Sequence, residues 1–165
     1  MLDSALHGLW RFGMYEPTDK RIVKTMTAIR DQLTNKGATG GVARYTNDYY
    51  FQVERDLSKT PGNPWFMCTL WLAQWYVATA TKVEQLQPAK DIIDWVVAHK
   101  GQAGMLSEQV DPNTGAPLSV SPLTWSHPQF VVAGHDYAKK LAHVRPQGPP
   151  RHPPPAGAPP PPTPQ

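Results

Sequence analysis

The segment from Pro64 to Thr81 constrains the fold most, because it carries no charged residue and would be apolar on every face of a helix. Its few polar residues include Thr69 and Gln74. A helix without a polar face must be covered all round, by protein or by lipid. The run barely reaches membrane-spanning length, and its central tryptophans favour an interface over a bilayer centre. We therefore expect Asn63-Pro64 to open a helix of the inner layer of a helical fold, with no membrane span.

Four further segments have the pattern of helices that bury one face. Each begins or ends at a residue typical of a helix boundary, such as Asp19 or Pro88 near a start and Gly37 or Gly101 after an end. They run from Asp3 to Phe12, from Thr18 or Asp19 to Leu33, from Gln87-Pro88 to about Lys100, and from Ser121-Pro122 to about Leu141. With five helices and no convincing strand, the sequence predicts an all-α architecture built from helical hairpins.

The last twenty or so residues cannot join this fold. From Pro146 to Gln165 the chain is mostly proline, which can neither continue a helix nor donate to a sheet. We expect residues 1–143 to form the folded part and residues 144–165 to form a disordered, polyproline-like tail. The tail could be a linker, or it could dock on aromatic-lined partners as part of an interaction module.

Composition excludes several classes of protein. The net charge is only +3 and the basic residues are scattered, which argues against a nucleic-acid partner. The single cysteine, Cys68, excludes an intrachain disulfide and agrees with a reducing compartment. No secretory signal is visible at the start of the chain, so the expected location is the cytoplasm.

Two irregular stretches stand before helices and are candidates for function, because sites commonly lie in loops on a rigid scaffold. One runs from Ala38 to Pro61 and holds Arg44 among several aromatic residues. The other runs from Gly104 to His127 and holds a carboxylate, Glu108. Aromatic rings beside an arginine could line a sugar or nucleotide pocket, or could merely pack the loop onto the core. We expect both loops to lie at the same rim of the fold.

The sequence gives little support for a calcium site, for a histidine metal site or for a reactive cysteine. The segment from Asp111 to Gly115 resembles the front of a calcium loop but lacks the later acidic ligands, so we expect a plain turn. The spacing of His127, His135 and His143 brings no ligand cluster together on a helix. Cys68 stands in apolar company and is expected to be a buried, inert thiol. We expect no metal and no cofactor.

Three motifs in register resemble the C-terminal part of the catalytic domain of glycoside hydrolase family 15, the glucoamylases and their relatives. They are Gly62 to Leu70, Met105 to Gln109 with Asp111 and Gly115, and Leu118-Ser119 followed by Leu123 to His127. The resemblance extends from Asp3 to about Leu141. It implies a partial (α/α)6 toroid, in which six helical hairpins form two rings with the site at the rim of the inner ring.

The resemblance also implies roles for individual residues. Glu108 matches the general base that activates the attacking water. Arg44 and Tyr49 resemble residues that hold the terminal glucose, and Trp65 and Trp125 resemble the aromatic walls of its subsite. These roles suit the residue types, since indoles stack on sugar faces and a guanidinium donates to pairs of hydroxyl groups. The implied ligand is an α-glucoside or malto-oligosaccharide.

An inverting glycosidase also needs a general acid, about 6.5–9.5 Å from the base. In the family that acid lies far upstream, and nothing between Met1 and Lys100 matches it; Glu16, Glu54 and Glu84 stand in charged surroundings. We therefore expect part of an inverting, exo-acting, glucan 1,4-α-glucosidase-like enzyme that carries the base and lacks the acid. Such a piece would be inactive and aggregation-prone alone, and the missing N-terminal part of the toroid would be its partner.

Two alternatives stay open. The chain could be a sugar-binding pseudo-enzyme that keeps the glucose subsite without catalysis, or an inactive fragment. The linkage that is cut also stays open, since starch-type and trehalose-type members of the family share these motifs.

Overall fold

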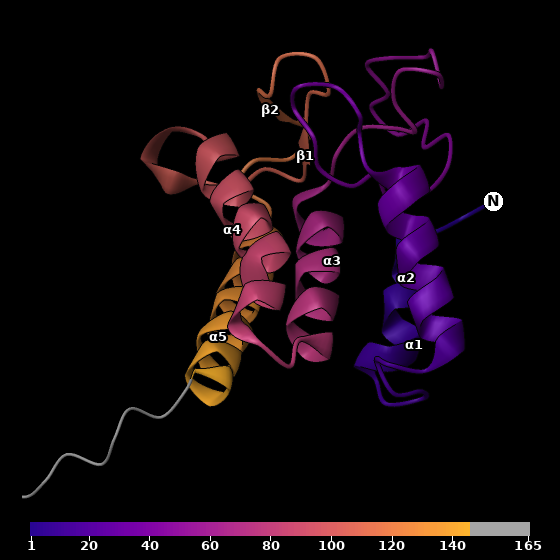
Figure 1. The fold of residues 1–165 in the computed structure, drawn as a ribbon. Helices are drawn as coiled ribbons and strands as arrows, with labels where there is room; N and C mark the ends of the chain where they lie inside the picture. Colours follow the sequence, from indigo (N-terminus) through magenta and orange to yellow (C-terminus); the bar gives the residue numbers. More distant parts are fainter. Residues whose placement is uncertain (146–165) are drawn as a thin grey trace, which may run out of the picture.

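The computed structural model describes residues 1–145, and they form a layered arrangement of helices with one very small sheet (Figure 1). The tail was predicted to begin at residue 144, but Val144 is still part of the last helix, and residues 146–165 lie outside the described residues. The elements are η1 (Ser4–His7), α1 (Gly8–Arg11), α2 (Lys20–Leu33), α3 (Phe66–Thr79), η2 (Val83–Leu86), α4 (Gln87–His99), η3 (Gln102–Gly104), β1 (Gln109–Val110), β2 (Pro117–Leu118) and α5 (Ser126–Val144). The all-α prediction is confirmed.

Helix α3 is the centre of the fold, as its uncharged sequence requires. It packs against α4 and α5 on one side and against η1 and α2 on the other (Figure 1). All but four of its residues are buried. Among the described residues, no helix is both long and apolar enough to cross a membrane. The covering of α3 therefore comes from its neighbouring helices.

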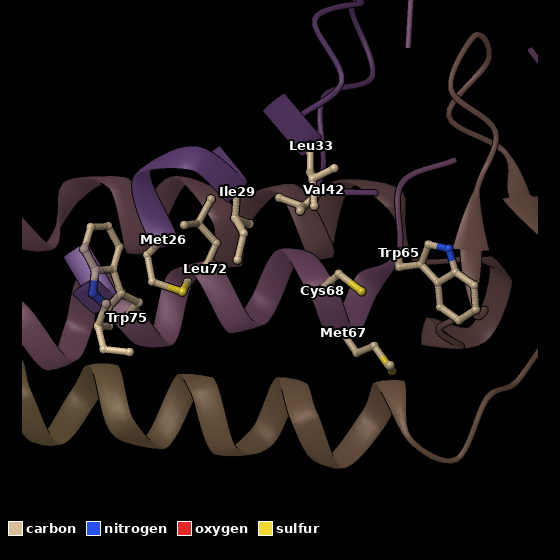
Figure 2. Packing of buried hydrophobic residues seen from close by; sticks show 10 residues of the cluster. Met26, Ile29, Leu33, Val42, Trp65, Met67, Cys68, Leu72 and Trp75 are labelled. Atoms are coloured by element: carbon tan, nitrogen blue, oxygen red, sulfur yellow. The ribbon is translucent and has the colours of Figure 1, made fainter. Parts of the chain in front are cut away.

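Helix α2 shows how local sequence sets an element. Asp19 caps its start, with the carboxylate accepting the N–H of Arg21 at 2.8 Å. Its buried stripe is Ile22, Met26, Ile29 and Leu33, which packs against α3 (Figure 2). Both the start and the end agree with the prediction.

The predicted start of the last helix was wrong. Pro122 lies in the preceding loop, where the Ser121–Pro122 peptide is cis, and α5 begins at Ser126. The chain before α5 is bound to the neighbouring loop, since the N–H of Leu123 donates to the carbonyl of Leu106 at 2.9 Å. That long-range bond keeps the segment out of the helix, and the local Ser-Pro pattern could not reveal it.

The sequence predicted no strand, but the loops at one end of the helices contain a small antiparallel sheet. Strands β1 and β2 form an antiparallel pair in the stretch that follows Glu108, with Gln109 opposite Leu118. The bond from the N–H of Asp111 to the carbonyl of Ala116 at 2.8 Å closes their turn. Asp111 also accepts the N–H groups of Asn113 and Thr114, so the predicted plain turn is confirmed.

Candidate active site

Two loops at one end of α3 build a shared cavity. The arginine loop (residues 38–65) leads into α3, and the glutamate loop (residues 105–125) leads into α5 (Figure 1). The cavity has a volume of about 450 Å³. It is lined by Asp3, Ala5, Arg44, Tyr45, Trp65, Met67, Trp71, Glu108, Leu123 and Trp125. Four of the five residues proposed from the sequence, Glu108, Arg44, Trp65 and Trp125, thus meet in one place.

Backbone pairing brings the two loops together. The N–H of Val110 donates to the carbonyl of Pro64 at 2.9 Å, and Trp65 forms an antiparallel bridge with Gln109. In the preceding turn, Gly41 has φ +77° and lies so close to its neighbours that an added Cβ would come within 2.6 Å of the Trp95 ring. Only glycine fits there, so Gly41 lets the arginine loop pack closely.

Glu108 is half-buried and fixed on several sides. Its Oε2 accepts the hydroxyl of Ser119 at 2.5 Å, and its main-chain N–H donates to Val120 at 2.8 Å. Ser119 has φ +64°, a conformation that is uncommon for a residue with a side chain. The second carboxylate oxygen has no hydrogen-bond partner among residues 1–145 in the structure. Glu108 is therefore held by one oxygen, while the other remains free to accept a proton from a ligand or water.

Arg44 is positioned by a carboxylate that the sequence analysis missed. Asp48, whose side chain is 1% exposed, accepts Nε at 2.9 Å and Nη2 at 2.8 Å. Burial opposes the charge of the guanidinium, but Asp48 outweighs it and raises the Arg44 pKa. Nη1 has no partner in the described part of the chain. The guanidinium of Arg44 therefore keeps Nη1 as an unpaired donor at the wall of the cavity.

The aromatic walls differ in depth. Trp65 is 4% exposed, and Arg44 Cζ lies 4.4 Å from the centre of its ring. Its Nε1 has no hydrogen-bond partner within residues 1–145. Trp125 is 55% exposed and meets Trp71 edge to face at 6.2 Å. Trp65 therefore forms an inner wall at the end of α3 (Figure 2), and Trp125 forms an outer one.

Tyr49, the fifth residue proposed from the sequence, is not among the residues that line the cavity, and its side chain is 78% exposed. Its neighbour Tyr50 instead turns inward, 6.2 Å from Trp65 and 5.5 Å from Arg44 Cζ. The backbone N–H of Tyr50 donates to Asp48 Oδ1 at 3.0 Å, which holds the main chain at this position, although Tyr50 is not among the residues that line the cavity either. Two adjacent tyrosines cannot be told apart by sequence when the loop has no regular period.

A buried amide pair joins the loops behind the cavity. Asn63 Nδ2 donates to Gln109 Oε1 at 2.7 Å, and Gln109 is fully buried directly after Glu108. The hydroxyl of Ser126 donates to the carbonyl of Ser107 at 2.8 Å, and this bond ties the glutamate loop to α5 as well. His127 Nε2 accepts the N–H of Leu106 at 3.1 Å. These residues belong to the matched motifs, but their supporting roles depend on contacts far apart in sequence.

Asp3 is a second carboxylate in the cavity and was not considered in the sequence analysis. Its Oδ1 accepts the N–H of Ala5 at 2.8 Å and caps η1. The adjacent backbone pairs with the arginine loop, where the N–H of Ser4 donates to the carbonyl of Arg44 at 2.8 Å. The backbone of Asp3 and Ser4 thus pairs with the arginine loop at Arg44 and Tyr45.

Other candidate chemistry finds no support within residues 1–145. No three metal-ligating side chains come together in that part of the chain. Cys68 is buried, and burial raises the pKa of its thiol to about 12, so the prediction of an inert thiol is confirmed.

The sequence profile described as glycosyl hydrolases family 15 matches residues 1–89 and 78–135, which is most of the chain. The chain belongs to this family. An uncharacterized glycosyl hydrolase of Methanocaldococcus jannaschii is 30% identical over 150 residues, covering 85% of this chain and 22% of that protein. A glucoamylase of Neurospora crassa is 26% identical over 167 residues, covering 72% of this chain and 25% of its own length.

Solved structures agree on the fold. A bacterial glucoamylase crystallised with acarbose superposes with a TM-score of 0.69 at 23% identity, over 84% of this chain and 20% of that one. A Hypocrea jecorina glucoamylase of family 15 gives a TM-score of 0.52 at 19% identity, over 79% of this chain and 28% of that one. The family 15 chain is thus a glucoamylase-like part of a helical toroid, as the sequence predicted, and it spans about a fifth to a quarter of the curated relatives it matches.

Proposed function

We propose that this family 15 chain forms the base-bearing wall of an inverting, exo-acting α-glucoside hydrolase. The observation that carries the proposal is the shared cavity of Glu108, Arg44, Trp65 and Trp125. At about 450 Å³, the cavity has the size expected of a small-molecule site. The relatives that bear the name glucoamylase support an α-glucoside or malto-oligosaccharide as the ligand.

In this proposal Glu108 is the general base. The free oxygen of its carboxylate accepts a proton from water as that water attacks the anomeric carbon, while Ser119 holds the other oxygen. The unpaired Nη1 of Arg44 donates to sugar hydroxyl groups in this proposal. Trp65 and Trp125 cover the apolar faces of the sugar ring. The sequence assigned Tyr49 to holding the terminal glucose; in this proposal Tyr50 instead supports Arg44, whose Cζ lies 5.5 Å from its ring.

The general acid comes, in this proposal, from toroid residues outside residues 1–145. Asp3 shares the cavity, but its capping bond to Ala5 assigns it to positioning. A second cavity of about 440 Å³ shares Ala5, Trp71 and Trp125 with the first and continues along α3. This open, largely apolar surface is where the remaining helices of the toroid would pack. The rest of the toroid is therefore the proposed partner.

Isothermal titration calorimetry of the purified chain with maltose tests the proposal. We expect the chain to bind maltose without hydrolysing it, and Arg44→Leu to weaken binding by about tenfold or more. Arg55→Leu is the matched control, because Arg55 is an exposed arginine of the same loop. Equal effects of the two variants, or an absence of maltose binding, would contradict the proposed site.

Hydrolysis by the isolated chain would contradict the part of the proposal that places the acid elsewhere. Asp3→Asn would then decide whether Asp3 is that acid. If a complete toroid containing this chain binds maltose but turns over no α-glucoside, the pseudo-enzyme alternative is correct.

A further inference from the structure

The start of α5 holds the main chain of the glutamate loop just before Glu108. His127, in the first turn of α5, accepts the N–H of Leu106 with its Nε2 at 3.1 Å. The carbonyl of Leu106 accepts the N–H of Leu123, which lies just before α5, at 2.9 Å. Both main-chain groups of Leu106 are thus bonded, two residues from the carboxylate proposed as the general base.

The bond between His127 and Leu106 fixes the protonation state of the imidazole. A ring nitrogen accepts a hydrogen bond only when it carries no proton, so the ring is neutral and holds its proton on Nδ1. A proton on Nε2 would turn the acceptor into a donor that faces a second donor, the N–H of Leu106. The bond from Leu123 involves main-chain groups only and does not depend on pH in this way.

The surroundings of His127 would not stabilise a charged ring. The first turn of α5 contains no acidic residue, and the start of a helix is the positive end of its dipole. His127 lines a small cavity of about 70 Å³, and within residues 1–145 the other titratable side chain at this cavity is Lys100 of the α4 end. Glu108 lines the site cavity instead. A protonated ring would therefore meet positive charge and lose its bond at the same time.

We propose that His127 is a positioning residue for Glu108, and that its protonation releases the glutamate loop and lowers activity at acid pH. His127 does not line the site cavity, so it acts through Leu106 and not on the sugar. The inference rests on the proposed function and deepens it, since it adds a pH-dependent control of the same site. Because a displaced base slows the chemical step, the effect falls on kcat more than on KM.

Two substitutions at His127 in a complete family 15 domain that contains these residues test this. The carbonyl oxygen of His127→Gln reaches about as far as Nε2 and can accept the N–H of Leu106, whereas that of His127→Asn is one bond too short. We expect His127→Asn to lower kcat about tenfold with KM within about twofold, and His127→Gln to keep kcat within about threefold. His135→Asn, at an exposed histidine of the same helix, is the matched control and should change neither constant.

The dependence on pH separates positioning from a merely structural role. Protonation of the base lowers the activity of every variant in acid, but His127→Gln cannot take up a proton at this position. Between pH 8 and pH 5, where imidazole groups gain their charge, we expect kcat of the wild-type domain to fall about threefold or more beyond that of His127→Gln. Hydrogen exchange in the purified chain gives a measure without turnover: the protection factor of the Leu106 N–H should fall about tenfold in His127→Asn and stay near the wild-type value in His127→Gln.

Equal acid losses in the wild-type domain and His127→Gln would overturn the inference. So would wild-type kcat in His127→Asn, or a His127→Gln variant that loses as much as His127→Asn. In those cases the wild-type domain still hydrolyses α-glucosides and the proposed function survives. If the wild-type domain hydrolyses none, the proposed function fails, and this inference fails with it. Should His127→Asn not fold, the pH comparison of the wild type with His127→Gln decides.

Discussion

The two loops that meet at the cavity are built in opposite ways. The glutamate loop is tied down around Glu108, by β1 and β2, by the hydroxyl of Ser119 on the Glu108 carboxylate and by the hydroxyl of Ser126 on the carbonyl of Ser107. The arginine loop is long and irregular, with Asn47 and Phe51 at positive φ and several exposed aromatic side chains. It depends mainly on two buried polar residues, Asp48 and Asn63.

The difference follows from what each loop would do. A general base must stand in a fixed place relative to water and the anomeric carbon, so a rigid hydrogen-bonded frame suits it. In the proposed function the arginine loop supplies the unpaired Nη1 of Arg44 as a donor to sugar, and such a donor must stay unbonded within the protein. The contrast can be tested by removing the group on which each loop depends most.

The largest effect is expected from Glu108→Gln in a complete family 15 domain that contains these residues. The amide keeps the shape of the side chain but cannot accept a proton, so kcat should fall about 10³-fold while KM changes little. Steady-state hydrolysis of maltose measures this. Glu84→Gln, at an exposed glutamate far from the cavity, should change neither constant. If Glu108→Gln keeps its turnover, Glu108 is not the general base, and the glutamate loop does not have the role that distinguishes it from the arginine loop.

Asp48→Ala should have the next largest effect, on stability. It leaves the guanidinium of Arg44 partly buried without its carboxylate, which typically costs about 3 kcal/mol of unfolding free energy. Asp94→Ala breaks an exposed pair with Lys90 at the same i,i+4 spacing and should cost less than about 1 kcal/mol. Urea unfolding followed by tryptophan fluorescence compares the two. Equal losses would mean that the arginine loop does not depend on Asp48.

A smaller effect is expected from Gln109→Leu, which removes the bond between the loops. Asn63 Nδ2 keeps its bond to Phe51 but loses Gln109, so we expect a loss of about 1–2 kcal/mol. Gln87→Ala, which removes an exposed bond to Asp91, serves as the control and should change stability by under about 0.5 kcal/mol. A neutral Gln109→Leu would show that the loops are independent.

Sequence reasoning succeeded where the signal is local. The bounds of α2 follow from Asp19 and the buried stripe, and the burial of α3 follows from its uncharged run. It failed at Pro122, where a main-chain bond from Leu123 to Leu106 outweighs the local helix signal. A helix start can be read from its sequence neighbours, as at Asp19, only where no distant partner binds the segment before the helix, as Leu106 binds Leu123.

The candidate site shows the same limit. The resemblance to family 15 named Glu108, Arg44, Trp65 and Trp125, and the structure brings the four together. Asp48, Asn63 and Gln109 were missed as supporting residues, because each is defined by a partner that the sequence pattern does not reveal. Asp48 carried one usable signal, since its four-residue spacing from Arg44 permits an ion pair within a tight turn.

The most direct test of the account is a ¹H–¹⁵N spectrum of the tryptophan indoles during a maltose titration of the chain. Trp65 and Trp125 line the proposed sugar site, whereas Trp75 and Trp95 donate to Pro17 and Thr39 outside the cavity. We predict that the indole signals of Trp65 and Trp125 shift together with one dissociation constant while those of Trp75 and Trp95 stay in place. Unmoved Trp65 and Trp125 signals, or equal shifts at all four indoles, would contradict the account.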